Sequence, residues 1–317
     1  MGKYILDSEH PLVSVLLPNW NTRDDSLEFL ESLARQTYPK SAIELIISDN
    51  DSSDGSQEAF RQWFAAHSSE PWHRLELVEL TGNQGIAVGY NAAYKHSSPQ
   101  SFAILRAESD VIWKPDLMAL LVADLLELPD AGVIGAKGVI GSAARYINWW
   151  TGRLYEMDPD IMLDCDCVFG GTFIARRSCI ERLGYFFRSE HFLASELEFC
   201  TRVKRLGYRV LYDPHVVVQH KGARSTANLD GSKFAYVCYR ELVLFHLAYN
   251  HFPQKAVFLA HAVAYCLKQA LLANGMHLRA FHDGLILGSL HRSVHLPGTP
   301  PGTQVSVADW LAQPRLQ

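Results

Sequence analysis

Short apolar runs alternate with amphipathic stretches through the first 126 residues of the chain. The apolar runs predict buried strands, and the stretches in which apolar residues recur every three or four positions predict helices. Strands are expected over 13–17, 44–48, 75–80 and 102–105, and helices up to 36 and over 56–67, 89–96 and 115–126. Strands that alternate with helices form a mostly parallel sheet, so an α/β domain is expected. Such sheets bind ligands in the loops that follow the strands.

The pattern loosens over 137–165, and then predicts a strand over 168–175, a helix near 195–206 and a strand over 216–219. Residues after 225 have a mostly helical pattern. We therefore expect a main domain over 1–225 and a helical extension over 226–317. An apolar run in the extension, 256–267, has only 12 residues, whereas a membrane-spanning helix needs about 20. No transmembrane helix is expected. Asp24 or Asp25 is expected to cap the first helix.

Composition and charge place the chain among globular proteins. Of its 317 residues, 48% are hydrophobic and 20% are charged, close to the average for folded domains. Residues 1–220 carry 20 basic and 30 acidic side chains, whereas 221–317 carry 9 and 4. A nucleic-acid-binding protein needs a basic surface on its main body to displace counterions from phosphates. The acidic main domain argues against nucleic acid as a partner and suits a metal-using enzyme.

The cysteines and the N-terminus indicate a cytoplasmic protein. The six cysteines have no C-x-x-C spacing, so neither a zinc ribbon nor a small disulfide scaffold is indicated. The first 15 residues lack a basic segment followed by a long apolar one, so no secretory signal is expected.

Polar residues follow the second and fourth predicted strands. A carboxylate such as Asp49 at a strand end can accept hydrogen bonds from a nucleobase or a ribose, but the same residue types also favour turns. Glu108 and Asp110 flank Ser109, and two carboxylates at this spacing can share Mg²⁺ or Mn²⁺; a solvated loop is the alternative. His220, after the run 216–219, is either a metal ligand or a structural histidine.

The segment that enters the helix near 195–206 is also rich in acids. Ser195 and Glu198 have the spacing of a capping box. Glu196 is not needed for that box, and an ionised carboxylate is what a general base for a sugar hydroxyl requires. Trp149 and Trp150 lie in the loosely patterned region, where their aromatic faces suit a sugar ring or an ordinary hydrophobic contact.

Taken in order along the chain, these segments resemble the family 2 glycosyltransferases with a GT-A fold, and in particular their rhamnosyltransferase-like branch. The matching segments are Asn19-Trp20-Asn21, the run 49–56 (DNDSSDGS), the run 83–91 (NQGIAVGYN), Glu108-Ser109-Asp110, the run 169–172 (FGGT), Ser195-Glu196 and His220-Lys221-Gly222. The resemblance covers residues 12–225, with 1–110 as the nucleotide-binding half and 111–225 as the acceptor-binding half.

The resemblance implies a metal-dependent inverting glycosyltransferase of cell-surface polysaccharide synthesis. It would move a sugar, with rhamnose from a dTDP carrier as the first expectation, from a nucleotide-diphosphate donor to a glycan or lipid-linked acceptor. Asp110 and His220 would bind Mn²⁺ or Mg²⁺, and Glu196 would be the catalytic base. Gly170, Gly171, Trp149 and Trp150 would bind the acceptor. The donor would contact Pro18, Asn19, Asn21, Asp49, Asp51, Asn83, Gly85, Asn91, Glu108 and Ser109.

Two residues differ from the pattern of that family. Glu108 and Glu196 stand where aspartates are usual, which keeps the charge and lengthens each side chain by one methylene. The alternative is therefore a non-catalytic module that binds a nucleotide sugar or glycan. A nucleotidyltransferase or an NAD-dependent oxidoreductase would need a Gly-rich phosphate loop or a G-x-G-x-x-G motif, which the corresponding segments lack.

The extension allows two further interpretations. Tyr236, Tyr239 and Arg240 lie within about one helical turn, so they either close over the donor or pack on the main domain. The net basic charge of 221–317 and its amphipathic helices also permit peripheral contact with the anionic inner face of a membrane, where lipid-linked acceptors reside.

Overall fold

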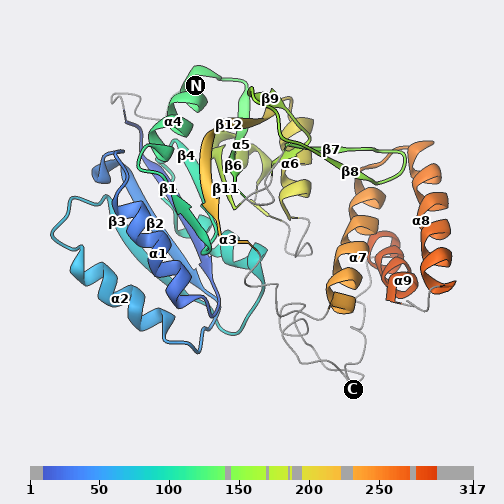
Figure 1. Ribbon diagram of the computed structural model, residues 1–317, viewed down its shortest axis with the longest axis horizontal. Coiled ribbons are helices and arrows are strands. Elements are labelled where there is room, and N and C mark those ends of the chain that lie inside the picture. Colours follow the sequence, from blue (N-terminus) through green and yellow to red (C-terminus); the bar gives the residue numbers. More distant parts are fainter. Residues whose placement is uncertain are drawn as a thin grey trace.

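A sheet with helices on both faces forms the main domain, and three further helices lie beside it at one end of the molecule (Figure 1). The structure is a computed structural model, and it describes residues 10–139, 144–168, 171–184, 186–187, 195–222, 231–271 and 276–290.

In the part of the chain that the structure describes, the main sheet has nine strands. They are β1 (Val13–Asn19), β2 (Ile43–Asp49), β3 (Arg74–Glu79), β4 (Ala103–Ala107), β5 (Val111–Trp113), β6 (Ala131–Gly138), β9 (Leu163–Asp164), β11 (Thr172–Arg176) and β12 (Arg209–His220). Their order is β3-β2-β1-β4-β11-β6-β12-β5, with β9 beside β12. The first four strands run parallel, as do β6 and β12, whereas β5, β9 and β11 are antiparallel to their neighbours. The expected α/β class with a mostly parallel sheet is confirmed.

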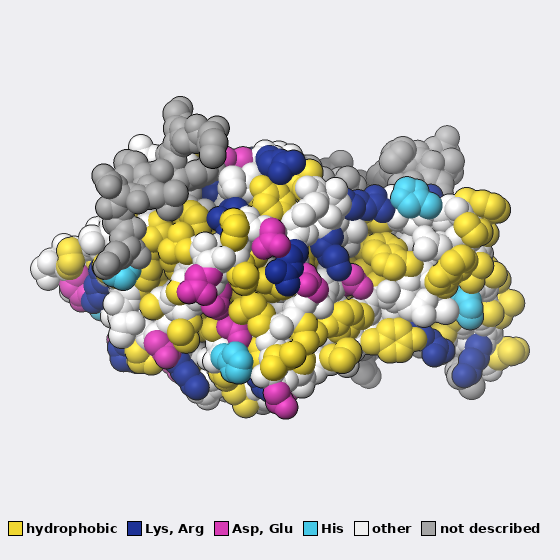
Figure 2. All heavy atoms as spheres, turned by 90° about the horizontal axis from the view of Figure 1, so that it is seen from above, with side chains coloured by type: hydrophobic (Ala, Val, Ile, Leu, Met, Phe, Trp, Pro, Cys, Tyr) yellow, Lys and Arg dark blue, Asp and Glu magenta, His cyan; other side chains and the backbone are white. Residues whose placement is uncertain are grey.

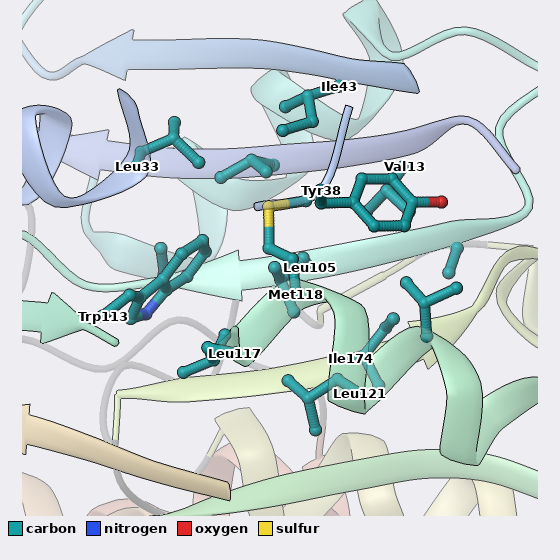
Figure 3. Close-up of a cluster of buried hydrophobic side chains, with 14 of the residues drawn as sticks. Val13, Leu33, Tyr38, Ile43, Leu105, Trp113, Leu117, Met118, Leu121 and Ile174 are labelled. Carbon is teal, nitrogen blue, oxygen red and sulfur yellow. The ribbon is translucent and has the colours of Figure 1, made fainter. Parts of the chain in front are cut away.

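Helices cover both faces of this sheet because alternate residues of its strands are apolar on both sides. The helices α1 (Arg23–Ala34), α2 (Ser56–Ala66) and α4 (Leu117–Glu127) pack on one face, and α3 (Ile86–His96), α5 (Arg177–Leu183) and α6 (Ser195–Arg205) pack on the other. Within β1, Val15 and Leu17 face the first group and Leu16 faces the second. Figure 3 shows the core between the sheet and the first group of helices, in which Leu33 of α1 and Leu117 of α4 contact the sheet. A short 3₁₀ helix, Lys40–Ala42, precedes β2.

The second half of the main domain differs most from the expected pattern. It contains β5, β6, α5 and a small antiparallel sheet of β7 (Ala144–Ile147), β8 (Leu154–Met157) and β10 (Cys167–Val168), none of which was predicted as a separate element. The strand expected over 168–175 corresponds to β10 and β11, and residues 169–170 lie outside the described residues. The strand expected over 216–219 is the end of the longer β12.

The extension is helical in its described residues, as expected. It consists of α7 (Gly231–Tyr249), α8 (Gln254–Leu271) and α9 (Met276–Leu290). The end of α7 is fixed to the main domain: the Tyr249 hydroxyl donates to Glu198 of α6, Arg205 donates to the Tyr249 carbonyl, and Asn250 donates to the carbonyl of Trp149 at 2.8 Å. Among the described helices, none is long and apolar enough to cross a membrane.

Candidate functional site

The loops that carry the predicted site residues meet at one edge of the main sheet. β1 and β2 are parallel, with Asn19 opposite Asp49, and β4 runs parallel to β1 on its other side. The antiparallel β11 brings the Gly171 carbonyl within 3.0 Å of the Glu108 N–H. The pairing of β12 with β5 places His220 opposite Val111. Residues from both halves of the main domain are thereby brought together.

A hydrogen-bonded network joins the loops after β1 and β2. The fully buried Asp49 carboxylate accepts from Asn19 Nδ2 (2.7 Å), the Ser52 N–H (2.9 Å) and hydroxyl (2.7 Å), and Gln57 Nε2 (2.8 Å). The side-chain oxygen of Asn19 accepts from two hydroxyls at the start of α1, each at 2.8 Å. Asn19 and Asp49, two of the predicted donor-binding residues, therefore use their polar atoms to fix the shape of the loops.

A single carboxylate caps two helices at this edge. Asp54 Oδ2 accepts from the N–H of Arg23, the first residue of α1 (2.9 Å), and its Oδ1 accepts from the N–H of Ser56, the first residue of α2 (3.0 Å). Burial alone would raise the pKa of Asp54, but a hydrogen bond from the Ser56 hydroxyl and the two backbone N–H bonds lower it below its ordinary value. The prediction that Asp24 or Asp25 caps the first helix is wrong, because both lie inside its first turn.

Asn21 and Asp51 form the exposed rim of the same loops. Both have left-handed backbone conformations, with φ of 52° and 61°, which Asn and Asp tolerate better than most residues. The Asn21 side chain accepts from the Ser53 N–H (2.8 Å), and Asp51 accepts from the Gly82 N–H (3.1 Å). Pro18 lies against α3, since a Cβ at Gly89 of that helix would come within 2.9 Å of the Pro18 Cβ.

The loop before α3 and the helix itself position Asn83, Gly85 and Asn91. The Asn83 side chain accepts from the Gly85 N–H at 3.1 Å, and Gly85 has φ of 90° at the N-cap of α3. Asn91 donates to the Phe187 carbonyl (2.7 Å) and accepts from the Phe187 N–H (2.9 Å). Its amide therefore tethers the segment before α6 to α3.

Three side chains of the site form a group suited to a metal ion. Glu108, Asp110 and His220 each offer one ligand atom, and the three atoms lie within 4.8 Å of one another. His220 Nε2 is 3.3 Å from Asp110 Oδ2 and 3.6 Å from Glu108 Oε2. The Lys221 N–H donates to the Asp110 carbonyl at 2.9 Å, which holds the end of β12 against the triplet. Ser109, between the two acids, is half-buried.

The chemistry of this group fits a divalent cation. Two carboxylates and an imidazole are a donor set that Mn²⁺ accepts, and oxygen-rich sets suit Mg²⁺. Burial tends to raise the pKa of Asp110, but the hydrogen bond from His220, its charge and that of Arg106 lower it below the ordinary value. An ionised Asp110 is the form that binds a metal.

Glu196, the predicted base, lies in the first turn of α6 and is only 7% exposed. Its Oε1 accepts from Arg106 Nη2 at 2.5 Å, and its Oε2 lies 3.2 Å from the Ser195 hydroxyl. Glu198 is fully buried, and it pairs with Arg202 (2.8 and 2.9 Å) and accepts from Tyr249.

Arg106 of β4 is the site residue that sequence reasoning missed. It is 2% exposed, and its Nη2 also donates to Glu108 Oε1 at 2.6 Å. The available signal was a charged residue directly after the strand predicted over 102–105. The strand in fact continues through Ala107.

The predicted acceptor-binding residues are dispersed. Gly171 lies against Glu108, because a Cβ there would be 3.2 Å from Glu108 Oε2. Trp149 stacks on Phe245 of α7, with ring centroids 5.7 Å apart, whereas Trp150 is 45% exposed. Gly170 lies outside the described residues. Tyr236 and Tyr239 of α7 contact α9 and α8, respectively, through Asp283 and the Ala262 carbonyl.

Comparison with known proteins identifies the family. The model of "Glycosyl transferase family 2" matches residues 14–184, more than half of the chain. The glycosyltransferase AglE of Haloferax volcanii is 33% identical over 100 residues, which are 32% of this chain and 31% of AglE. The probable glycosyltransferase YdaM of Bacillus subtilis is 27% identical over 222 residues, 66% of this chain and 50% of YdaM. The chain thus spans about a third to a half of the length of these curated relatives.

A solved structure shows the same fold. The mannosyltransferase PcManGT from Pyrobaculum calidifontis, solved in complex with GDP-Man and Mn²⁺, superposes with a TM-score of 0.59 at 22% identity, over 96% of this chain and 79% of that one. The chain belongs to glycosyl transferase family 2 and has the GT-A fold. The predicted family and fold class are confirmed, and the rhamnosyltransferase-like branch remains a prediction.

Proposed function

We propose that the protein is a metal-dependent, inverting glycosyltransferase that moves a sugar from a nucleotide-diphosphate donor to a glycan or lipid-linked acceptor of the cell envelope. The observation that carries this proposal is the convergence of Glu108, Asp110 and His220 at the strand ends, with Glu196 linked to them through Arg106. Family membership and the likeness to a mannosyltransferase solved with its donor and Mn²⁺ support it.

In this proposal the metal group and the rim loops bind different parts of the donor. Glu108, Asp110 and His220 hold Mn²⁺ or Mg²⁺, and the exposed edges of Asn21, Asp51 and the Asn83 loop contact the nucleotide. A divalent cation bound there supplies Lewis-acid stabilisation for the departing diphosphate. Asn19 and Asp49 act by shaping the loops, and Pro18, Gly85, Asn91 and Ser109 complete the donor side.

Glu196 is the proposed base. Direct displacement at the anomeric carbon with inversion needs one group that takes the proton of the acceptor hydroxyl. Glu196 is a carboxylate held by Arg106 beside the metal group, and its second oxygen lies 3.2 Å from the Ser195 hydroxyl. Gly170 and Gly171 line the acceptor side, with Trp150 as the exposed aromatic.

The first experiment is a thermal-shift panel of UDP, dTDP, GDP and CDP, each with and without Mn²⁺ or Mg²⁺. A nucleotide at about 100 times its dissociation constant should stabilise the protein by about 2.7 kcal/mol. A metal-dependent shift with one nucleotide supports the proposal and identifies the carrier, with dTDP expected for a rhamnose donor. A shift that is absent for all four nucleotides contradicts it.

The substitution Glu196→Gln separates transfer from mere binding. As a base, Glu196 should be essential, so transfer should fall by about 1,000-fold while the nucleotide-induced thermal shift persists. A non-catalytic binding module, the alternative function, would show no transfer in the parent protein and the same thermal shift in both.

We also propose that the extension contacts an anionic membrane surface through the outer face of α8. Apolar residues recur along that face at 256, 260, 263, 267 and 271, and Val263, Leu267 and Leu271 are 42%, 56% and 89% exposed. The helix contains no Asp or Glu and carries Lys255 and Lys268. Figure 2 shows hydrophobic side chains with Lys, Arg and His over this end of the molecule. Apolar and basic residues on one helix favour an anionic interface.

Flotation with liposomes tests this surface. The protein should float with vesicles that contain phosphatidylserine and remain in the soluble fraction with purely zwitterionic ones. Leu267→Ser combined with Leu271→Ser should abolish flotation without a loss of secondary structure. A parent protein that does not float, or a double variant that floats equally well, contradicts the proposal.

A further inference from the structure

Arg106 lies between Glu108, a member of the metal group in the proposed function, and Glu196, the proposed base. One nitrogen atom, Nη2, donates to Glu108 Oε1 at 2.6 Å and to Glu196 Oε1 at 2.5 Å. The other oxygen of Glu108 belongs to the metal group, 3.6 Å from His220 Nε2. The proposed base and the metal group are therefore joined by one side chain.

The surroundings of Arg106 hold its guanidinium in place. The group lies 4.9 Å from the centroid of the Tyr90 ring and 5.6 Å from that of Phe173. The Tyr90 hydroxyl donates to the Ala107 carbonyl at 2.8 Å, which fixes that ring beneath the end of β4. An arginine guanidinium stays cationic in proteins, and two carboxylates lie within hydrogen-bonding distance of this one.

A cation is needed at this point for an electrostatic reason. Glu108, Asp110 and Glu196 would bring three negative charges into a small and mostly buried volume, where charges repel more strongly than in water. Arg106 offsets the repulsion between the two glutamates and leaves the outer oxygens of Glu108 and Asp110 directed at His220.

The length of the two glutamates matches this arrangement. An aspartate at 108 or 196 would be shorter by one methylene, so its carboxylate would be withdrawn from Nη2 by more than a hydrogen bond tolerates. The two glutamates therefore share one structural partner.

We propose that Arg106 is a positioning residue that sets the distance and orientation of Glu196 relative to the Glu108–Asp110–His220 group. This inference rests on the proposed function, since it assigns Arg106 a part in transfer. Arg106 does not touch the reacting atoms, and it acts through the two carboxylates that it holds.

The test compares steady-state transfer by Arg106→Met, Arg106→Lys and the parent with a nucleotide sugar and Mn²⁺. Displacement of a reacting group by about 1 Å costs about 100-fold in rate, so kcat of Arg106→Met should fall by that factor while KM for the donor changes less than about threefold. The metal-dependent thermal shift should persist. Lysine restores one donor and the charge, so Arg106→Lys should recover about tenfold of the loss.

A matched control is another buried arginine, Arg177 of α5. It is 4% exposed, and it donates to the hydroxyls of Ser97 and Ser101. Arg177→Met removes a buried guanidinium away from the site, so it should lower stability and leave kcat per folded molecule within about threefold of the parent.

The outcomes separate cleanly. A folded Arg106→Met variant with kcat within about threefold of the parent, or with a loss no greater than that of Arg177→Met, overturns the inference. If Arg106→Met does not fold, Arg106→Lys decides: a kcat about tenfold below the parent at unchanged donor KM supports the inference, and a parent-like kcat overturns it. A parent without transfer overturns the proposed function as well, whereas an active parent with an equally active variant overturns only the role of Arg106.

Discussion

Replacing Gly171 with alanine tests how closely β11 approaches the metal group. Gly171 has φ of +75°, where a side chain costs about 1 to 2 kcal/mol. The new Cβ would lie 2.6 Å from Val111 Cγ1 and 3.2 Å from Glu108 Oε2, and relief of such overlap costs about 1 to 3 kcal/mol. The free energy of unfolding should therefore fall by about 2 to 5 kcal/mol.

The same substitution should impair transfer, because Glu108 is one of the two groups that must move to make room. A shift of about 1 Å in Glu108 would disturb both the metal group and the contact with Arg106, at a cost of about 100-fold in kcat. Urea unfolding measures the first effect, and transfer per folded molecule measures the second.

Gly184, at the end of α5, provides the matched control. Its φ is +82°, and a Cβ there would meet no atom within 4 Å. Gly184→Ala should therefore show only the backbone cost of about 1 to 2 kcal/mol and a parent-like kcat. If Gly171→Ala is no more destabilising than Gly184→Ala, or if it transfers at the parent rate, the close packing of β11 against Glu108 is refuted.

Three further predictions concern charge. Burial lowers the pKa of His246 to about 4; the unfolded chain therefore binds more protons between pH 6.5 and 4, and stability should fall by up to about 3 kcal/mol as the pH drops through this window. His246→Phe should flatten that part of a urea-unfolding pH series, and an unchanged slope would contradict the assignment. Burial and the neighbouring Asp213 raise the pKa of Asp124 to about 7. The free energy of unfolding should therefore fall as the pH rises from about 4 to 7. Asp124→Asn should raise it by about 1 to 2 kcal/mol at pH 8, after allowance for solvent screening, and change it little at pH 4. If Asp124→Asn changes the free energy of unfolding equally at pH 4 and pH 8, the raised pKa of Asp124 is contradicted. Asp110→Asn should abolish the metal dependence of the nucleotide thermal shift, and a shift that keeps its metal dependence would remove Asp110 from the ligand set.

The sequence predicted those helices and strands whose hydrophobic pattern is visible within the element itself. β1, β2 and β4 are mostly apolar and buried along their whole length, and the helices that follow them carry an apolar face. β6 escaped notice because glycine and alanine dilute its apolar pattern. Those glycines are needed for tertiary packing: a Cβ at Gly135 would lie 2.4 Å from Val168, and one at Gly132 would lie 2.6 Å from Val203. Such contacts arise between distant segments and leave no local signal.

In the site, too, residues in local motifs could be predicted and contacts between distant segments could not. The motifs led to Glu108, Asp110 and His220, which the structure brings together. Partners supplied by distant segments were not accessible to local reasoning. The buried Glu198, for example, accepts from the hydroxyl of Tyr249, which lies 51 positions away in α7. Arg106 was missed because one of its two acceptors, Glu196, lies 90 positions away in the sequence.

The double cap formed by Asp54 has a consequence for local unfolding. Its carboxylate holds the first N–H groups of α1 and α2, although Arg23 and Asp54 are 31 positions apart in the sequence. When one of these helix ends frays, the carboxylate is released from its fixed geometry and the other end loses a fixed partner as well. In native-state hydrogen exchange, the amides of Arg23 and Ser56 should therefore exchange with a common opening free energy, as one cooperative unit that frames the entrance to the site.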